Sequence, residues 1–477
     1  MDLYSLGLLD ALRACREGRA TVQDYIASCS ARIVALEPRI QAWEWFDASR
    51  AMAEAEERAG GILGDLPLFG IPVGVKDIIA TRGIPTRYGS RIFATHVPTQ
   101  SAWVVRRLES LGGLVMGKTV TTEFAYRQPG KTRNPWNVAH TPGGSSSGSA
   151  AAVAAGFVPV AIGTQTLGSV IRPAAYCGVV GYKPSFGAIS RTGIHPFSST
   201  LDTVGVFARS VADAAWFGAC LMGTDPRDEG TLFRGAESLL RVPLEPLASA
   251  PRIAVVRTPK WNLASEPQKA HFDACVAKLA GAGAAVREVH LPKAFDAAWD
   301  NVMVLLSRDA VKSFLLIESR HRIRLSPPLI ELLDRGHGVT SDQYARARAR
   351  RDEYCRWFEK AFDRFDAIVT IPATGEAPEG LGNTGDASFC SLWTQSGLPA
   401  VTIPSGFGPR GLPLGLQVVG RYRGDEHALK VASWVESVLA FKPGLAASGA
   451  SEADTGTRPY LLSNPIAAAT TSRSSTQ

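Results

Sequence analysis

The sequence predicts an α/β fold in which a mixed, largely parallel, twisted sheet is sandwiched between helical layers. Three observations lead to this prediction. Short apolar runs rich in β-branched residues alternate with amphipathic helical segments along most of the 477 residues. The apolar fraction of 45% and the charged fraction of 20% are ordinary for a globular enzyme with a sizeable core. Between Thr141 and Lys183, two Gly- and Ser-rich loops flank an Ala-rich apolar segment, which suits backbone that closely approaches a ligand or another backbone.

The first part of the chain is predicted to change from helices to alternating strands and helices. Thr21 is the expected N-cap of the second helix, because its hydroxyl precedes an amphipathic run. The expected elements are, in order, helices at 2–17, 21–36 and 49–59, a strand within 68–80, a helix at 100–111 and a strand at 114–116.

The later part repeats a β-α-β rhythm on either side of a long helical region. The expected elements are a strand and then a helix within 201–220, a connection at 225–250, a strand at 253–257, a helix at 266–282, a strand at 286–289, a mostly helical layer at about 297–365, strands at 367–371, 400–403 and 416–419, and a helix at 426–439. We expect one domain over residues 1–440, in which the helical layer shapes the substrate pocket, and a flexible tail at 441–477.

Composition and charge exclude several classes of partner. The chain has 51 Lys and Arg against 44 Asp and Glu, and its only dense basic run, Arg346–Arg351, is typical of a solvated helix face rather than a nucleic-acid site. Seven scattered cysteines without a CxxC pair argue against a disulfide framework and a zinc site. The N-terminus does not resemble a signal peptide, and no apolar run has membrane-spanning length. We therefore expect a cytoplasmic protein without nucleic-acid or membrane partners.

The segment Gly112–Thr119 fits the expression of a phosphate-binding loop, G-x-x-x-x-G-K-[ST]. Such a loop follows a strand and stays open between its glycines. Here a helix precedes it, and residues 114–116 are strand formers. We therefore do not interpret the segment as a nucleotide site.

Three interpretations of the Gly- and Ser-rich loops compete. Gly144–Gly148 fits the G-x-S-x-G elbow of α/β-hydrolases, but that elbow follows a strand, whereas loop residues precede it here, and the available histidine, His427, begins a helix. Alternatively, the loops are turns that only pack helices on the sheet, which explains either loop alone better than both. The third interpretation needs no histidine and depends on a lysine.

Lys76 lies within the strand predicted at 68–80. Burial removes hydration from an ammonium group and favours the neutral amine, which is a competent base. Lys76 can then take a proton from a bridging serine, which in turn activates a nucleophilic serine. The alternative is a structural ion pair with Asp77, although adjacent strand residues point to opposite faces of the sheet.

Five segments resemble the amidase signature family, and they occur in the family's order over roughly residues 1–440. They are GVKD (Gly74–Asp77), PGGSSSGSAAAVAAG (Pro142–Gly156), GTQTLGSVIRPAAYCGVVGYKPS (Gly163–Ser185), LDTVGVFARSVADAA (Leu201–Ala215) and SGLPAVTIPSGF (Ser396–Phe407).

This resemblance implies the amidase signature fold and hydrolysis of a C–N amide bond by a Ser-cisSer-Lys triad. By motif position, the nucleophile is Ser169, the bridging residue is Ser145 with a cis peptide bond to Gly144, and the base is Lys76. The resemblance assigns the oxyanion hole to the backbone N–H groups of Thr166, Leu167, Gly168 and Ser169. It also implies that no metal and no cofactor takes part.

The sequence departs from the common family pattern at two positions, with Leu167 in place of the usual glycine and Gln165 in place of a frequent aspartate. Arg172 either binds a substrate carboxylate in a bidentate manner or supports the loop through a buried ion pair. Asp202 and Arg209 are expected to brace the site.

The candidate walls of the substrate pocket are Tyr126, Gln128, His195 and Trp393. The function implied first is hydrolysis of a small carboxamide or related linear amide, by a chain that acts alone or as a homodimer. The alternative is the glutaminase subunit of a tRNA-dependent amidotransferase complex, in which the same triad releases ammonia for a partner enzyme. The sequence does not identify the amide.

Overall fold

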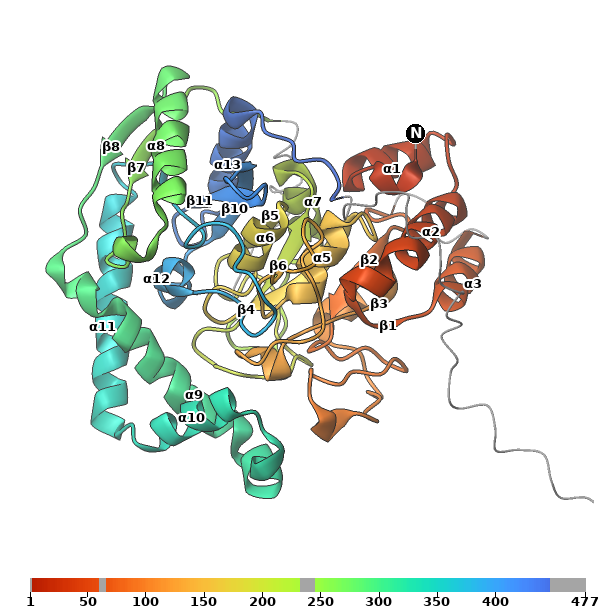
Figure 1. The fold of residues 1–477 in the computed structure, drawn as a ribbon, viewed down its shortest axis with the longest axis horizontal. Coiled ribbons are helices and arrows are strands. Elements are labelled where there is room, and N and C mark those ends of the chain that lie inside the picture. The colour runs from red at the N-terminus through yellow and green to blue at the C-terminus, as the bar shows by residue number, and fades with distance from the viewer. Residues whose placement is uncertain (1, 60–65, 232–244, 447–477) are drawn as a thin grey trace, which may run out of the picture.

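A large mixed sheet forms the centre of the protein (Figure 1). The computed structural model describes residues 2–59, 66–231 and 245–446. The strands are β1 (Trp43–Phe46), β2 (Pro72–Lys76), β3 (Leu114–Thr119), β4 (Val160–Gln165), β5 (Val180–Lys183), β6 (Thr203–Ala208), β7 (Arg252–Val255), β8 (Ala285–Glu288), β9 (Ala367–Thr370), β10 (Ala400–Phe407) and β11 (Pro413–Val419). They are arranged in the order β1-β3-β2-β4-β6-β5-β10-β11-β9-β7-β8.

Parallel pairing is confined to two blocks of this sheet, β3-β2-β4 and β9-β7-β8. The other neighbouring strands, as far as the structure describes them, pair in antiparallel fashion. The mixed α/β class is confirmed, with more antiparallel pairing than the β-α-β rhythm predicts. One reason is that a short connection at 408–412 joins β10 and β11 directly as an antiparallel pair.

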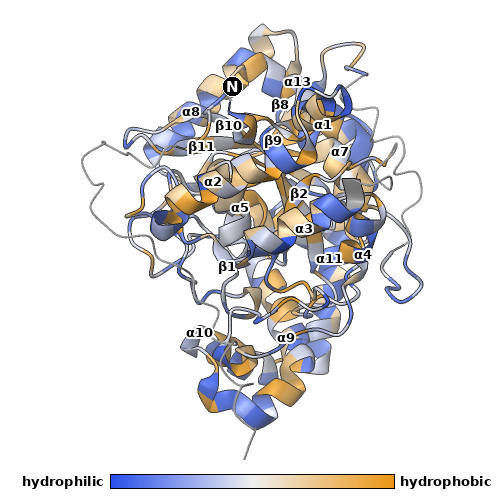
Figure 2. Ribbon diagram, turned by 90° about the vertical axis from the view of Figure 1, so that its right-hand side faces the viewer, coloured by the Kyte–Doolittle hydropathy of each residue, from blue (hydrophilic) through white to orange (hydrophobic). Residues whose placement is uncertain are grey.

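Helices cover both faces of the sheet. They are α1 (Leu8–Arg16), α2 (Val22–Ile40), α3 (Ala48–Ala59), α4 (Trp103–Ser110), α5 (Ser147–Ala154), α6 (Ile171–Cys177), α7 (Val211–Leu221), α8 (Glu266–Gly281), α9 (Ala298–His321), α10 (Pro327–His337), α11 (Ser341–Ala361), α12 (Ser388–Gln395) and α13 (Asp425–Leu439). Figure 2 shows α2 and α5 to one side of β2, and α4 and α7 to the other. The predicted sandwich of helical layers around a sheet is therefore present.

Most predicted elements are found with shifted bounds. The helix predicted at 21–36 is α2, and the hydroxyl of Thr21 accepts a hydrogen bond from the amide of Asp24 at 3.0 Å, as expected of an N-cap. The helix predicted at 2–17 begins only at Leu8, because the carboxylate of Asp213 accepts a hydrogen bond from the amide of Leu9 at 2.9 Å and caps it there. This contact comes from a distant helix, so the local pattern does not contain it.

The segment Gly112–Thr119 is not a phosphate-binding loop. Helix α4 ends at Ser110, and residues 114–119 form the buried strand β3. The interpretation that rejected a nucleotide site is confirmed. The short strand β1, which pairs with β3, was not predicted.

The helices α9, α10 and α11 form the helical layer predicted at 297–365, and α9 and α10 project beyond the sheet in both views (Figures 1 and 2). Part of the connection predicted at 225–250, and most of the tail predicted at 441–477, lie outside the described residues. Within the described ranges, no helix combines the length and apolar character needed to span a membrane.

At Gly148, α5 lies close to the backbone next to β1 and β3. A Cβ atom at this position would lie 2.3 Å from the carbonyl oxygen of Ala42 and 2.3 Å from the amide nitrogen of Val120. Because backbone atoms cannot move aside as a flexible side chain can, we expect Gly148→Ala to lower the free energy of unfolding by roughly 1–3 kcal/mol or more, measured by urea denaturation.

Gly281, at the end of α8, is the matched control, because a Cβ atom there meets nothing within 4 Å. Gly281→Ala should leave the free energy of unfolding unchanged or raise it by up to about 1 kcal/mol. A similar loss in both variants would contradict the close approach at Gly148.

Candidate active site

Lys76 ends β2 and is fully buried. Its Nζ lies 2.8 Å from Oγ of Ser145 and 2.8 Å from Oγ1 of Thr164. Within the described residues, it forms no ion pair with a carboxylate. Burial lowers the pKa of Lys76 well below the usual value for lysine, and the charge of Asp202 acts in the opposite direction. The neutral amine is therefore the favoured form.

Asp77 is not the partner of Lys76. Its carboxylate lies 3.5 Å from Nζ of Lys118 on β3 and accepts a hydrogen bond from the amide of Arg87 at 2.9 Å. Burial raises the pKa of the Asp77 carboxyl to about 6 and lowers the pKa of Lys118 to about 8. The alternative in which Lys76 serves only as the ion-pair partner of Asp77 is therefore wrong.

Ser145 follows Gly144 across a cis peptide bond, as the family resemblance implies. The serines beside it hold the loop on the sheet, because Ser146 donates to the carbonyl of Thr164 at 3.1 Å and Ser149 donates to the carbonyl of Ile162 at 3.0 Å. Hydrogen bonds from these two residues to β4 thus hold the segment that follows Ser145 against the strand next to Lys76.

The α/β-hydrolase interpretation is not supported. Ser146, the central serine of that motif, is the N-cap of α5 and follows a loop rather than a strand. His427 lies on α13 and approaches the carboxylate of Asp366 at 3.5 Å, whereas the hydroxyl of Ser146 donates to the carbonyl of Thr164. Within the described residues, no hydrogen bond or ion pair joins the two.

Ser169 lies just before α6 and shares the wall of one cavity, called the substrate cavity here, with Ser145. Apolar side chains of α9 form part of this wall, namely Trp299, Met303 and Leu306. The helical layer therefore contributes to the cavity that both serines line.

The backbone amides of residues 166–169 donate no hydrogen bond within the described part of the chain. The next two amides, those of Val170 and Ile171, both donate to Oε1 of Gln165, at 2.8 and 3.0 Å. A run of unpaired amides beside a serine hydroxyl can stabilise an oxyanion.

Gln165 fixes both ends of this loop without a charge. Its Nε2 donates to the hydroxyl of Thr394 at 2.9 Å, and that hydroxyl donates to the carbonyl of Leu167 at 2.8 Å. Leu167 itself lines the substrate cavity and packs against the apolar cluster of α9.

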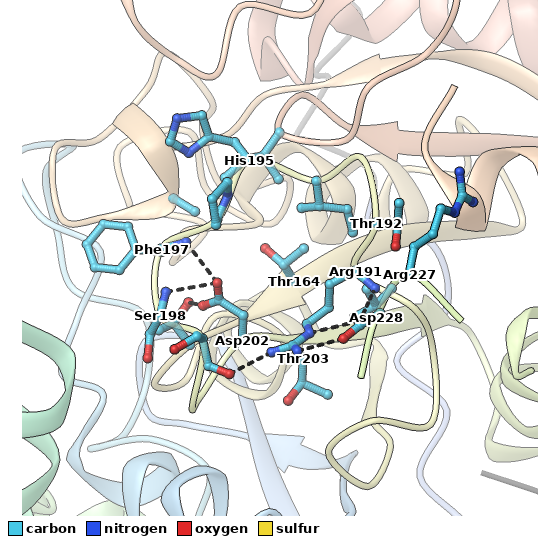
Figure 3. A pocket seen from close by; sticks show the side chains of 17 residues that line it. Thr164, Arg191, Thr192, His195, Phe197, Ser198, Asp202, Thr203, Arg227 and Asp228 are labelled. Atoms are coloured by element: carbon cyan, nitrogen blue, oxygen red, sulfur yellow. Dashed lines mark hydrogen bonds and ion pairs between the residues drawn. The ribbon is translucent and has the colours of Figure 1, made fainter. Parts of the chain in front are cut away.

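Asp202 braces the loop from below, as the sequence predicts. It accepts hydrogen bonds from the hydroxyl of Thr166 at 2.7 Å and from the amides of Phe197 and Ser198 at 2.8 and 2.9 Å (Figure 3). Burial raises the pKa of the Asp202 carboxyl above its usual value, and these hydrogen bonds act in the opposite direction. Arg209 lies elsewhere, where it donates to the carbonyl of Leu6.

A family model described as Amidase matches residues 24–429. The chain belongs to the amidase family. A glutamyl-tRNA(Gln) amidotransferase subunit from Synechococcus sp. strain CC9605 is 33% identical over 93% of this chain and 99% of that relative. The equivalent subunit from Symbiobacterium thermophilum is 34% identical over 87% of this chain and 93% of that relative.

Solved structures show the same relationship. A 6-aminohexanoate cyclic dimer hydrolase complexed with substrate has a TM-score of 0.82 at 26% identity, covering 94% of this chain and 100% of that chain. Native peptide amidase from Stenotrophomonas maltophilia has a TM-score of 0.79 at 29% identity, covering 92% and 98%. The predicted amidase signature resemblance is thus confirmed, and the protein is a C–N hydrolase of the amidase family.

In this amidase, Arg172 is buried and holds the loop through backbone oxygens rather than through an ion pair. Its Nε donates to the carbonyl of Thr384 at 2.7 Å, and its Nη2 donates to the carbonyl of Gly144 at 2.7 Å. Its Nη1 has no hydrogen-bond partner within the described residues, and Arg172 lines the substrate cavity. Arg172 can therefore hold the loop with Nε and Nη2 and also contact a ligand with Nη1.

The predicted pocket walls fall into different places. Tyr126 lines the substrate cavity and stacks on Phe197. His195 lines a neighbouring cavity. Gln128 is exposed, and Trp393 lies in a core cluster with its indole N–H bonded to the carbonyl of Phe389. Neither Gln128 nor Trp393 lines the substrate cavity.

Sequence reasoning missed Thr164, Lys118 and Asp386, the last of which lines the substrate cavity. Thr164 stands five residues before Ser169, inside the segment already singled out. Lys118 carried the same signal as Lys76, a lysine within an apolar strand. No local pattern indicated Asp386.

Asp202→Ala should lower the free energy of unfolding by roughly 1–3 kcal/mol or more, because it leaves one buried hydroxyl and two amides without their acceptor. Thr166→Val is the matched control, since it removes only one of these hydrogen bonds and should cost about 1 kcal/mol. Chemical denaturation of both variants measures the difference. Equal losses would contradict the brace formed through Phe197 and Ser198.

Proposed function

We propose that this amidase hydrolyses a small carboxamide through an acyl-enzyme on Ser169, with Ser145 as the bridging residue and Lys76 as the base. The observation that carries this proposal is the buried contact of 2.8 Å between Nζ of Lys76 and Oγ of Ser145, on a cavity wall that Ser169 shares. A lysine that is neutral in this environment can take up the proton that a serine nucleophile must lose.

In the acylation step, Oγ of Ser169 attacks the amide carbon while its proton passes to Ser145, and Lys76 takes the proton of Ser145. The oxyanion that forms is stabilised by the unpaired amides of residues 166–169. The proton then returns through Ser145 to the nitrogen as the C–N bond breaks. In deacylation, water attacks the acyl-enzyme, and the same two side chains carry its proton back to Ser169.

The substrate cavity suits an acyl group with an apolar part and a polar end. Trp299, Met303 and Leu306 provide the apolar wall, and Tyr126 lies beside them. We assign Nη1 of Arg172 to an oxygen of the substrate, because a buried guanidinium N–H without a partner is costly unless a ligand accepts its hydrogen bond.

A second candidate is the glutaminase subunit of a tRNA-dependent amidotransferase. The two relatives described above support it, since both are subunits of such an enzyme. The cavity carries Arg127 and Asp386 as well as Arg172, and such charges suit the carboxylate and ammonium groups of glutamine. In this case the partner would be a further protein subunit rather than a second copy of the chain.

The purified chain should hydrolyse hexanamide with neither ATP nor a partner subunit present, and Ser169→Ala should lower kcat/KM by about 10⁴-fold or more. A fluorophosphonate should label the wild-type chain covalently and leave Ser169→Ala unlabelled, which mass spectrometry measures. Unchanged labelling of the variant would refute Ser169 as the nucleophile. The second candidate would be favoured if the chain hydrolysed glutamine but not hexanamide, and did so only when a partner subunit was present.

The rate should depend on pH through Lys76, because only its neutral form accepts a proton. Burial places the pKa of Lys76 well below the usual 10.5, so kcat/KM for hexanamide should rise with pH along a limb centred below 10.5 and then level off. Activity is lost as the pH falls through this pKa. A limb centred at or above 10.5 would show that Lys76 is hydrated and charged, contrary to the proposed role.

A further inference from the structure

Figure 3 shows the residues around a second cavity, called the side cavity here. Its volume is about 230 Å³, against about 60 Å³ for the substrate cavity. Ala125, Thr166 and Phe197 line both cavities. The two cavities are therefore neighbours beside the oxyanion loop.

The side cavity also reaches the proposed base. Thr164 lines it, and the hydroxyl of Thr164 lies 2.8 Å from Nζ of Lys76. The other contact of Nζ is Ser145, on the wall of the substrate cavity. Lys76 therefore stands between the two cavities, with one hydroxyl facing each.

The arginines around the side cavity already have partners of opposite charge. Arg191 is matched by Asp228 at 2.8 Å and also donates to the carbonyl of Ser199 at 2.9 Å. Arg227, at the rim, is matched by Asp225 at 3.1 Å.

With both arginines paired, the remaining carboxylate of the lining is that of Asp202, which accepts hydrogen bonds from the hydroxyl of Thr166 and from the amides of Phe197 and Ser198. His195 adds no charge near neutral pH, because burial lowers its pKa to about 4. Such a lining favours a neutral polar or positively charged group and disfavours a carboxylate.

We propose that the side cavity receives the amine part of the substrate, so that this amidase cleaves N-substituted amides whose amine part is small and either neutral or cationic. The inference rests on the proposed function, in which the nitrogen takes its proton from Ser145 and leaves as the C–N bond breaks. The leaving nitrogen therefore lies beside Ser145 and Lys76. The side cavity, which shares Thr166 with the substrate cavity, is the larger space next to that nitrogen for a substituent.

The volume supports a substituent of a few non-hydrogen atoms. A water molecule needs roughly 10–15 Å³ of such space, so about 230 Å³ holds several waters or a short amine chain. The products are then a free amine, which carries the proton from Ser145, and a carboxylate formed when water hydrolyses the acyl-enzyme.

The test compares three amides with one acyl group, namely hexanamide, N-(2-aminoethyl)hexanamide and N-(carboxymethyl)hexanamide. We expect the wild-type chain to cleave the first two and to show kcat/KM at least about tenfold higher for the aminoethyl than for the carboxymethyl amide. Ser199→Trp places a large ring at the exposed mouth of the side cavity. It should lower kcat/KM for the aminoethyl amide at least about tenfold and leave hexanamide within about twofold, because ammonia needs no side cavity.

The matched control is Ser437→Trp, an exposed position on α13 that lines neither cavity. It should leave all three rates unchanged. Equal losses for hexanamide and the aminoethyl amide in Ser199→Trp, with fluorophosphonate labelling of Ser169 intact, would overturn the inference, as would cleavage of hexanamide alone by the wild-type chain. Should Ser199→Trp fail to fold, Thr192→Trp, at another wall position, has the same expected outcome. Absence of both labelling and hexanamide hydrolysis would refute the proposed function itself.

Discussion

The separation of two buried lysines on neighbouring strands is the constraint on which the site depends. Lys76 and Lys118 are both fully buried, but Lys118 has the carboxylate of Asp77 and donates to the carbonyl of Ile79 at 2.6 Å. Lys76 has two hydroxyls instead. Because an ammonium group without a counter-charge is costly to bury, it loses its proton rather than remaining charged. Because side chains alternate between the two faces of a sheet and Val75 is paired with Lys118, Lys76 and Lys118 point to opposite faces. The lysine on one face is structural, and the lysine on the other face is basic.

The second constraint is a clamp that joins the helical layer to the oxyanion loop. Asp309 on α9 accepts hydrogen bonds from the hydroxyls of Ser198 and Thr200 at 2.6 and 2.7 Å, and from Tyr344 on α11 at 2.6 Å. Asp202 holds the same segment from its other side and also holds Thr166 of the oxyanion loop. The carboxylates of Asp309 and Asp202 thus hold one segment between the helical layer and the oxyanion loop.

The sequence predicted the elements of the site that local pattern defines. Thr21 as a helix cap, the lysine within an apolar strand and the Gly- and Ser-rich loops are all visible within short windows. The ion pair of Asp77 with Lys118 was not predictable, because it depends on the register of β2 against β3, where Val75 stands opposite Lys118. Trp393 was predicted as a pocket wall because aromatic side chains often line pockets. Helix α12 is buried on every side, however, and Trp393 lies in the core.

Other residues of the site are brought together only by the tertiary fold. Asp309 and the α9 side chains come from a helix that lies far along the chain from Ser169. Helical spacing predicted the helices of this layer, but spacing alone does not say which face meets the sheet. For the same reason the larger side cavity had no signal in the sequence, because its walls come from several separate loops and strands.

The two departures from the family pattern compensate for one another. An aspartate at position 165 would only accept hydrogen bonds, so the hydroxyl of Thr394 would have to donate to it. Gln165 instead donates to Thr394, so that hydroxyl can donate to a carbonyl, and the carbonyl of Leu167, at 2.8 Å, is nearer to it than that of Cys390, at 3.1 Å. In a trans peptide the carbonyl and the following N–H point in opposite directions, so fixing the carbonyl of Leu167 also fixes the N–H of Gly168 away from Thr394. The backbone at Leu167 does not adopt a positive φ, so this orientation needs no glycine there.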